Sequence, residues 1–280
     1  MHAEPKYAMR LLVLLLCLQP ALLSAAPRVV TSIAPLQEIT SAIMADIAIP
    51  QLIIDAHQSA HHFAFKPSHM RRLQQADLVI WVDRHFEAGF NRVAEILPNT
   101  TRTLELMPAL GIDNDDGHFW YSPELLQMST GIVAKALIDL DPKNQSRYLE
   151  NAQRLKQAIS EWRQGFQQRW QDSAPRLLTD HGFLAHFGND FKLFEITAIH
   201  DHHDAHGGLK GLERVEMWLR DKPADCLLTL ETAPSALAAS LAARHRLGTI
   251  SLSDTGQKSS TILQRLERLQ AALETCRQQQ

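Results

Sequence analysis

The sequence has little net charge, few cysteines and, beyond its first 26 residues, no long apolar run. Its formal net charge is −3, with basic and acidic residues mixed along the chain, so nothing indicates a nucleic-acid partner. After the N-terminal run, no stretch reads as a transmembrane helix, which needs about 20 apolar residues. Internal repeats and low-complexity linkers are also missing. The limits of domains must therefore be inferred from the local helix and strand patterns.

The N-terminal residues have the layout of a secretory signal peptide. A basic start that includes Arg10 leads into an apolar run at 11–23, and small residues follow at 24–26. The apolar run is too short to span a bilayer. We therefore expect export, with cleavage near Ala25 or Ala26.

Of the three cysteines, Cys17 lies in this signal peptide and leaves Cys226 with Cys276. An even pair in an exported protein favours one disulfide, with two buried free thiols as the alternative. Because the bridge would close a loop of about 50 residues, it would contribute ~3–4 kcal/mol in the chain-entropy model.

Strand and helix patterns alternate in both halves of the chain, and a long helix separates them. Apolar positions at steps of three and four predict this helix over 144–172, about 40 Å long, either as a strut across two lobes or as a coiled-coil arm. Since strand–helix units resume after it, we favour the strut. We predict an α/β fold of two lobes with central sheets, bridged by one long rigid helix. The predicted limits are 1–26 for the signal peptide, 27–143 for the N-terminal lobe, 144–172 for the linking helix and 173–280 for the C-terminal lobe.

Three histidines, the first of them the earlier member of the pair at 61–62, and one aspartate fall in loops after predicted strands. His61 and His118 lie in the first lobe, and His181 and Asp254 lie in the second. Open α/β sheets bind ligands beyond the carboxyl ends of their strands, so these residues could meet in a cleft between the lobes. Three imidazoles and one carboxylate form a tetrahedral zinc shell. On spacing alone, surface or capping histidines are the alternative.

A family resemblance runs in order from about Val29 to Cys276 and is carried by five stretches: VVTSIAPL, HHFAFKPSHMRRLQQADLVIWVD, DGHFWYSPE, DCLLTLETAPSALAASLA and LGTISLSDTG. Together they resemble the periplasmic zinc-binding components of ABC zinc importers, the ZnuA-like members of the metal-binding solute-binding-protein family. The resemblance implies a monomer in the periplasm that captures Zn2+ as a transported ligand and delivers it to a membrane permease with its ATPase. The zinc branch of the family also has a disulfide in the C-terminal lobe, at places that match Cys226 and Cys276.

The same resemblance implies a set of metal ligands. The first three family ligands match His61, His118 and His181, and the fourth, an acidic residue, matches Asp254. The SDTG stretch is one residue off the usual spacing, so Asp254 or water completes the shell. Manganese-selecting relatives carry a carboxylate at the place of His181, whereas an imidazole there is typical of zinc binders.

A histidine cluster, IHDHHDAHGG, lies outside this ligand set. It contains His200, His202, His203 and His206 in a loop that ends in two glycines. Single histidines at strand ends suit a stiff shell better than one such loop does. We predict an accessory, low-affinity metal loop, with a solvated and dispensable loop as the alternative; His186 is expected to pack on a helix.

Two other functions are compatible with a three-histidine zinc shell. One is a zinc metallochaperone or buffer without a transporter, and the other is a zinc hydrolase. The sequence has no H-E-x-x-H motif and no Glu or His that a motif places as a general base. We therefore predict capture rather than catalysis, and no enzymatic activity.

Overall fold

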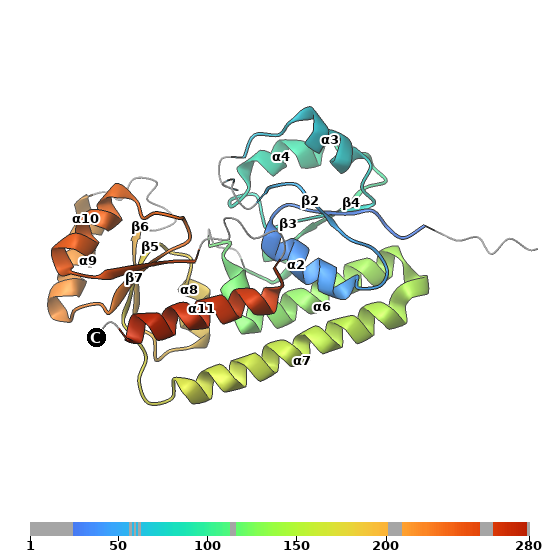
Figure 1. Ribbon diagram of the computed structural model, residues 1–280. Helices are drawn as coiled ribbons and strands as arrows, with labels where there is room; N and C mark the ends of the chain where they lie inside the picture. The colour runs from blue at the N-terminus through green and yellow to red at the C-terminus, as the bar shows by residue number, and fades with distance from the viewer. Residues whose placement is uncertain are drawn as a thin grey trace, which may run out of the picture.

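Two parallel four-stranded sheets form the centres of two lobes (Figure 1). The computed structural model describes residues 25–55, 58, 60, 63–112, 116–200, 209–252 and 260–278. The first sheet has the order β2-β1-β3-β4, with β1 (Val29–Thr31), β2 (Gln51–Leu52), β3 (Leu78–Trp81) and β4 (Arg102–Glu105). The second has the order β6-β5-β7-β8, with β5 (Leu177–His181), β6 (Ile196–His200), β7 (Cys226–Thr229) and β8 (Gly248–Ser251).

Both sheets have the same topology. In each, the chain begins on an inner strand, moves to the strand on one side, and then crosses to the other side. The carboxyl ends of the inner strands therefore flank the point where the strand order reverses, which is where open α/β sheets bind ligands. The predicted α/β class with two lobes is confirmed.

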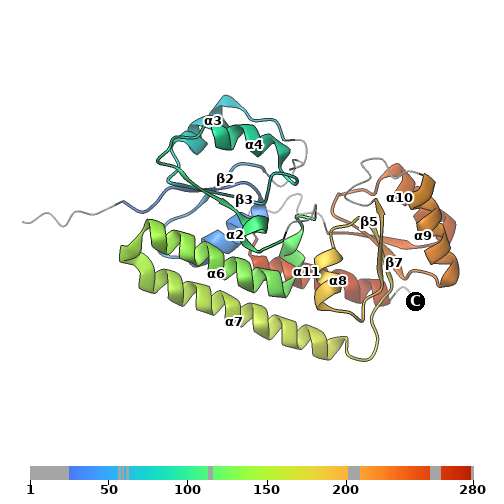
Figure 2. The same ribbon diagram turned by 180° about the vertical axis from the view of Figure 1, so that it is seen from behind.

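Helices cover both faces of each sheet. In the first lobe, α3 and α4 lie on one face, and α2 and α6 lie on the other, as Figures 1 and 2 show. In the second lobe, α9 and α10 cover the outer face, and α8 and α11 lie on the side toward the first lobe. Their bounds are α2 (Ala34–Ile43), α3 (Pro67–Gln74), α4 (Ala88–Glu95), α5 (Leu106–Ala109), η1 (Phe119–Tyr121), α6 (Pro123–Leu140), η2 (Pro142–Asn144), α7 (Gln145–Arg169), α8 (Ala185–Asp190), α9 (Leu209–Asp221), α10 (Ala236–His245) and α11 (Ile262–Arg277).

Local sequence signals explain several helix starts. Ser122 caps α6, because its side chain accepts a hydrogen bond from the Leu125 amide at 3.1 Å, and Pro123 occupies the first turn, where no amide donor is needed. At α11, Thr261 and Gln264 form a reciprocal capping box. These contacts satisfy amides that the helices leave unpaired.

Helix α7 is the predicted strut. Its 25 residues extend about 37 Å along both lobes. Near its start, the Asn151 amide donates to the carbonyls of Ile43 and Ala45 in the first lobe, at 2.9 and 3.1 Å. Near its end, Phe166 packs in an aromatic cluster of the second lobe that includes Phe187, with ring centres 5.6 Å apart. The largest hydrophobic core cluster accordingly contains residues of both lobes.

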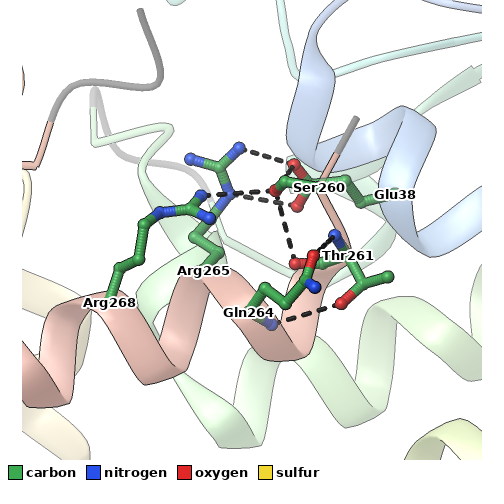
Figure 3. A network of polar contacts seen from close by, with 6 residues as sticks. All are labelled: Glu38, Ser260, Thr261, Gln264, Arg265 and Arg268. Atoms are coloured by element: carbon green, nitrogen blue, oxygen red, sulfur yellow. Dashed lines mark hydrogen bonds and ion pairs between the residues drawn. The ribbon is translucent and has the colours of Figure 1, made fainter. Parts of the chain in front are cut away.

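Helix α11 also contacts both lobes, which the sequence did not indicate. The predicted disulfide Cys226–Cys276 joins it to β7. In Figure 3, Arg265 of α11 meets Glu38 of α2, with Nη2 to Oε1 at 2.7 Å and Nε to Oε2 at 3.1 Å. Both side chains are 5% exposed, and the Ser260 hydroxyl donates to the same carboxylate at 2.8 Å. A covalent bond at one end and a buried ion pair at the other thus fix α11 between the lobes.

Across the described part of the chain, no helix has both the length and the apolar character needed to cross a membrane. The predicted signal peptide, residues 1–26, falls almost entirely outside the described residues.

Candidate metal centre

The two described histidines of the predicted shell lie next to each other at the junction of the lobes. His181 is the last residue of β5, and His118 lies in the loop between α5 and η1 that follows β4. Their ring centres are 5.1 Å apart, and the ring planes form an angle of 54°. Tertiary structure therefore brings together two imidazoles that are 63 residues apart in the sequence.

The other two predicted ligands, His61 and Asp254, lie outside the described residues. Each belongs to a segment that follows a described strand, β2 for His61 and β8 for Asp254. Among the described residues alone, no group of three or more His, Cys, Asp or Glu side chains is placed to hold a metal ion. The His118–His181 pair is thus the described portion of the predicted shell.

His118 is held on several sides. Its side chain is 3% exposed, and the rings of Phe86 and Trp120 each lie 5.1 Å from it, centre to centre. The carboxylate of Asp116 lies 2.9 Å from Nδ1 and accepts a hydrogen bond from the His118 amide at 3.0 Å. A proton on Nδ1 that forms a hydrogen bond to the carboxylate makes Nε2 the imidazole nitrogen that can bind a metal ion.

Gly117 allows this loop to lie against Phe86. A Cβ atom at position 117 would come within 2.5 Å of Cδ2 and 2.7 Å of Cγ of the Phe86 ring. Such distances are too short for any side chain, so only glycine fits here while Phe86 keeps its place beside His118. The family-like stretch DGHFWYSPE contains this glycine, but its steric role depends on Phe86, 31 residues earlier.

His181 has a more open setting. It is half-buried, and Phe183 lies 5.2 Å from it between ring centres. The preceding residue, Asp180, accepts hydrogen bonds from the amide and the hydroxyl of Ser235, both at 2.7 Å. These bonds attach the end of β5 to the start of α10 and fix the backbone that carries His181.

The histidine cluster begins beside this site. His200 ends β6 and pairs in register with His181 of the neighbouring strand. Its Nε2 lies 3.9 Å from Oδ1 of Asp180. The other three members, His202, His203 and His206, lie outside the described residues.

The buried residue His186 does more than the sequence predicted. It lies on α8, as expected for a packing residue, but its Nε2 also reaches the Asp116 carbonyl oxygen at 2.9 Å. The second lobe thereby contacts the residue that holds His118. Nothing in the sequence connects positions 116 and 186, because they meet only across the two lobes.

A buried carboxyl group also lies near the carboxyl end of β3. Glu87 is fully buried, and its Oε2 accepts a hydrogen bond from the Val82 amide at 2.6 Å. Burial raises the pKa of Glu87 to about 8. The group is therefore mostly protonated at neutral pH, a property that the sequence did not indicate.

Two α/β lobes joined by a long helix, with histidines of both lobes at the junction, define a metal-type solute-binding protein. The chain belongs to the family described as ZnuA, zinc-uptake complex component A, periplasmic, whose model matches residues 29–276. Proteins of this family bind and transport metal as solute-binding components, so the chain is not an enzyme.

Relatives of the chain are named for different metals. The chain is 25% identical to the high-affinity zinc uptake system protein ZnuA of Yersinia pestis over 171 residues, 49% of this chain and 54% of that one. It is 26% identical to the iron-binding protein YfeA of Yersinia pestis over 189 residues, 60% and 58% of the two chains. A mutant manganese-bound periplasmic metal-binding protein from Candidatus Liberibacter asiaticus has the same fold, with a TM-score of 0.78, 19% identity and coverage of 89% and 99%. Membership of the family thus establishes metal binding. Which metal is bound depends on the residues that act as ligands.

Proposed function

We propose that the protein captures Zn2+ with high affinity in the periplasm and delivers it to an ABC permease for import. The observation that carries this proposal is the pair His118 and His181, one from each lobe, with ring centres 5.1 Å apart. The family description as a component of a zinc-uptake complex supports it.

The spacing of the two rings suits a shared zinc ion. Zinc–nitrogen bonds are about 2.0–2.1 Å long, and structural zinc is tetrahedral. Two imidazoles bound through one nitrogen each would then have ring centres about 5 Å apart. The observed distance agrees with this value, so little rearrangement of the two rings is required.

We propose His61, His118, His181 and Asp254 as the ligands, with water as the alternative to Asp254. Three nitrogen ligands favour zinc over manganese, which prefers carboxylate oxygens. This choice of metal rests on the imidazole at His181, because relatives are named for zinc and for iron.

We further propose that His200, His202, His203 and His206 form an accessory loop that binds zinc more weakly. The place of His200 beside His181 in the sheet supports this, since zinc held by the loop would lie near the main site. Residues 1–26 would direct export as a signal peptide. The mature protein would act as a monomer with a permease and its ATPase as partners.

Metal titration of the purified mature apo protein tests the ligand assignment. We expect His118→Ala and His181→Ala to abolish tight zinc binding, and serine at His202, His203 and His206 to preserve it. His245→Ala is the matched control, because His245 pairs with Glu216 on the outer side of the second lobe. Tight binding that survives His118→Ala, or that is lost in the loop variant, would contradict the proposed site.

A parallel titration with Mn2+ tests the metal. We expect the wild-type protein to bind Zn2+ much more tightly than Mn2+, and His181→Asp to narrow the difference. Equal affinity of the wild-type protein for both ions would refute the proposed preference for zinc.

A further inference from the structure

We infer that Asp116 and His186 are positioning residues through which the second lobe orients the zinc ligand His118 of the first lobe. This inference rests on the proposed function, because it takes His118 as a ligand. It goes further by naming two residues that contact no metal and yet set the affinity of the site.

The first step is the contact between Asp116 and His118. Asp116 is 6% exposed, and its Oδ1 lies within hydrogen-bond distance of both the amide and Nδ1 of His118. Two contacts to one carboxylate oxygen restrain both the backbone and the ring of His118. They favour the tautomer with a proton on Nδ1, which leaves Nε2 to bind the metal.

The second step crosses between the lobes. Nε2 of His186 lies 2.9 Å from the Asp116 carbonyl oxygen and 3.5 Å from its Oδ2. The carbonyl can only accept, so Nε2 of His186 donates. His186 is 7% exposed on α8 and is therefore shielded from competing water.

The third step is the origin of His186 in the chain. It lies five residues after His181, in the first turn of α8, the helix that follows β5. One short segment of the second lobe thus supplies its own candidate ligand and supports the ligand of the other lobe. We expect this shared support to limit changes in the His118–His181 spacing when zinc binds.

Asp190 provides a matched control on the same helix. Its Oδ2 accepts hydrogen bonds from the Ser122 hydroxyl at 2.8 Å and from the Glu124 amide at 3.0 Å. Asp190 therefore joins α8 to the first lobe as His186 does. These hydrogen-bond donors lie at the start of α6 rather than at His118.

The test is a competition titration of zinc into the mature apo protein. Absorption spectra of the Co2+-substituted protein measure the ligand geometry. We expect Asp116→Ala and His186→Phe to weaken zinc binding roughly 10- to 100-fold, the usual effect of losing a partner of a metal-bound histidine. Asp116→Asn and His186→Gln should restore most of the affinity, because each keeps the required acceptor or donor. Asp190→Ala should leave the affinity and the Co2+ spectrum unchanged.

The outcomes separate this inference from the proposed function. If His118→Ala abolishes binding but Asp116→Ala and His186→Phe bind as the wild type does, the inference is wrong and the proposed function stands. An equal loss of affinity in Asp190→Ala would also overturn the inference. It would mean that breaking any contact between the lobes weakens zinc binding, whether or not the contact involves His118. If His118→Ala binds zinc normally, the proposed function itself fails. Since Asp116→Ala could impair folding, His186→Phe tests the same path and keeps a ring in place.

Discussion

The two lobes share one strand order but hold their candidate ligands in different ways. His181 belongs to a β-strand, so the sheet and the Asp180–Ser235 bonds place its backbone. His118 lies in a loop and is placed by side chains, chiefly Asp116 and the aromatic residues around it. A ligand on regular structure therefore needs few dedicated neighbours, whereas a ligand in a loop depends on tertiary contacts.

The two helices that join the lobes differ in what is added to their apolar packing. Helix α7 packs against both lobes mainly through apolar and aromatic side chains, as its sequence pattern indicates. Helix α11 also buries apolar side chains, among them Leu266 and Leu269, and is attached in addition by the Cys226–Cys276 disulfide and the Glu38–Arg265 ion pair. Breaking either attachment should therefore have a large and localised effect.

We expect the largest loss of stability from removing one partner of the buried ion pair. Glu38→Ala leaves the Arg265 guanidinium buried without its carboxylate and should lower the free energy of unfolding by about 3–5 kcal/mol, as measured by urea denaturation. The control is Asp139→Ala, which breaks an exposed i,i+4 pair with Lys135 and should cost less than about 1 kcal/mol. Equal effects of the two substitutions would show that the Glu38–Arg265 attachment contributes no more than a surface pair.

Loss of the disulfide should have the next largest effect. Replacing Cys226 and Cys276 by serine opens a loop with a sequence separation of 50 residues and should lower the free energy of unfolding by about 3–4 kcal/mol. Denaturation with and without a reductant measures the effect. The wild-type protein should lose the same amount under the reductant, and the serine variant should lose nothing more. A reductant effect that persists in the serine variant would contradict this explanation.

Glycine substitutions test the difference between the two candidate ligands. Gly117→Ala forces Cβ into Phe86 and should cost about 1–3 kcal/mol, together with a loss of zinc affinity. Gly188→Ala, on α8 of the second lobe, brings Cβ only to 3.4 Å from Ile196 and should have a smaller effect. Thermal unfolding and zinc titration of both variants check this. Equal losses would mean that the His118 loop is no more tightly packed than the second lobe.

Measured over a single pH unit, the smallest expected effect is a pH dependence specific to the first lobe. Glu87 has a folded-state pKa of about 8, above its ordinary value near 4.5, so the folded protein binds more protons than the unfolded chain between these values. Its contribution to stability is fully present below about pH 4.5 and is lost as the pH rises to about 8. The loss is at most about 1.4 kcal/mol per pH unit.

Glu87→Gln should remove this slope when urea denaturation is repeated between pH 5 and 8. The exposed Glu150→Gln on α7 serves as the control and should behave like the wild type. An unchanged slope in Glu87→Gln would mean that Glu87 does not hold its proton in the folded protein.

Most of the fold could be predicted from local patterns. The apolar stripe of α7, the Ser122–Pro123 start of α6 and the buried run at β3 each depend on residues close in sequence. Short helices were harder to predict: α5 has four residues, too few for a periodic pattern to develop. The second role of α11 could not be predicted, because Glu38 and Arg265 are 227 residues apart.

The candidate site was also predictable only in part. The place of His181 at the end of a recognisable strand and that of His118 in the loop before α6 could be predicted, and the structure brings the two side by side. His61 and Asp254 stay predictions, since they lie outside the described residues. Asp116 and His186 were missed, because a hydrogen bond between lobes leaves no local signal.

The sequence by itself determined the strand–helix alternation, the strut and the residue types that suit zinc, since these follow from local periodicity and side-chain chemistry. Tertiary structure alone decided which polar groups meet. It buried the Glu38–Arg265 pair, raised the pKa of Glu87 and placed the Asp116–His186 contact behind His118. The physical reason is that hydrogen bonding and desolvation act over a few ångströms in space, and the folded chain brings distant residues within that range.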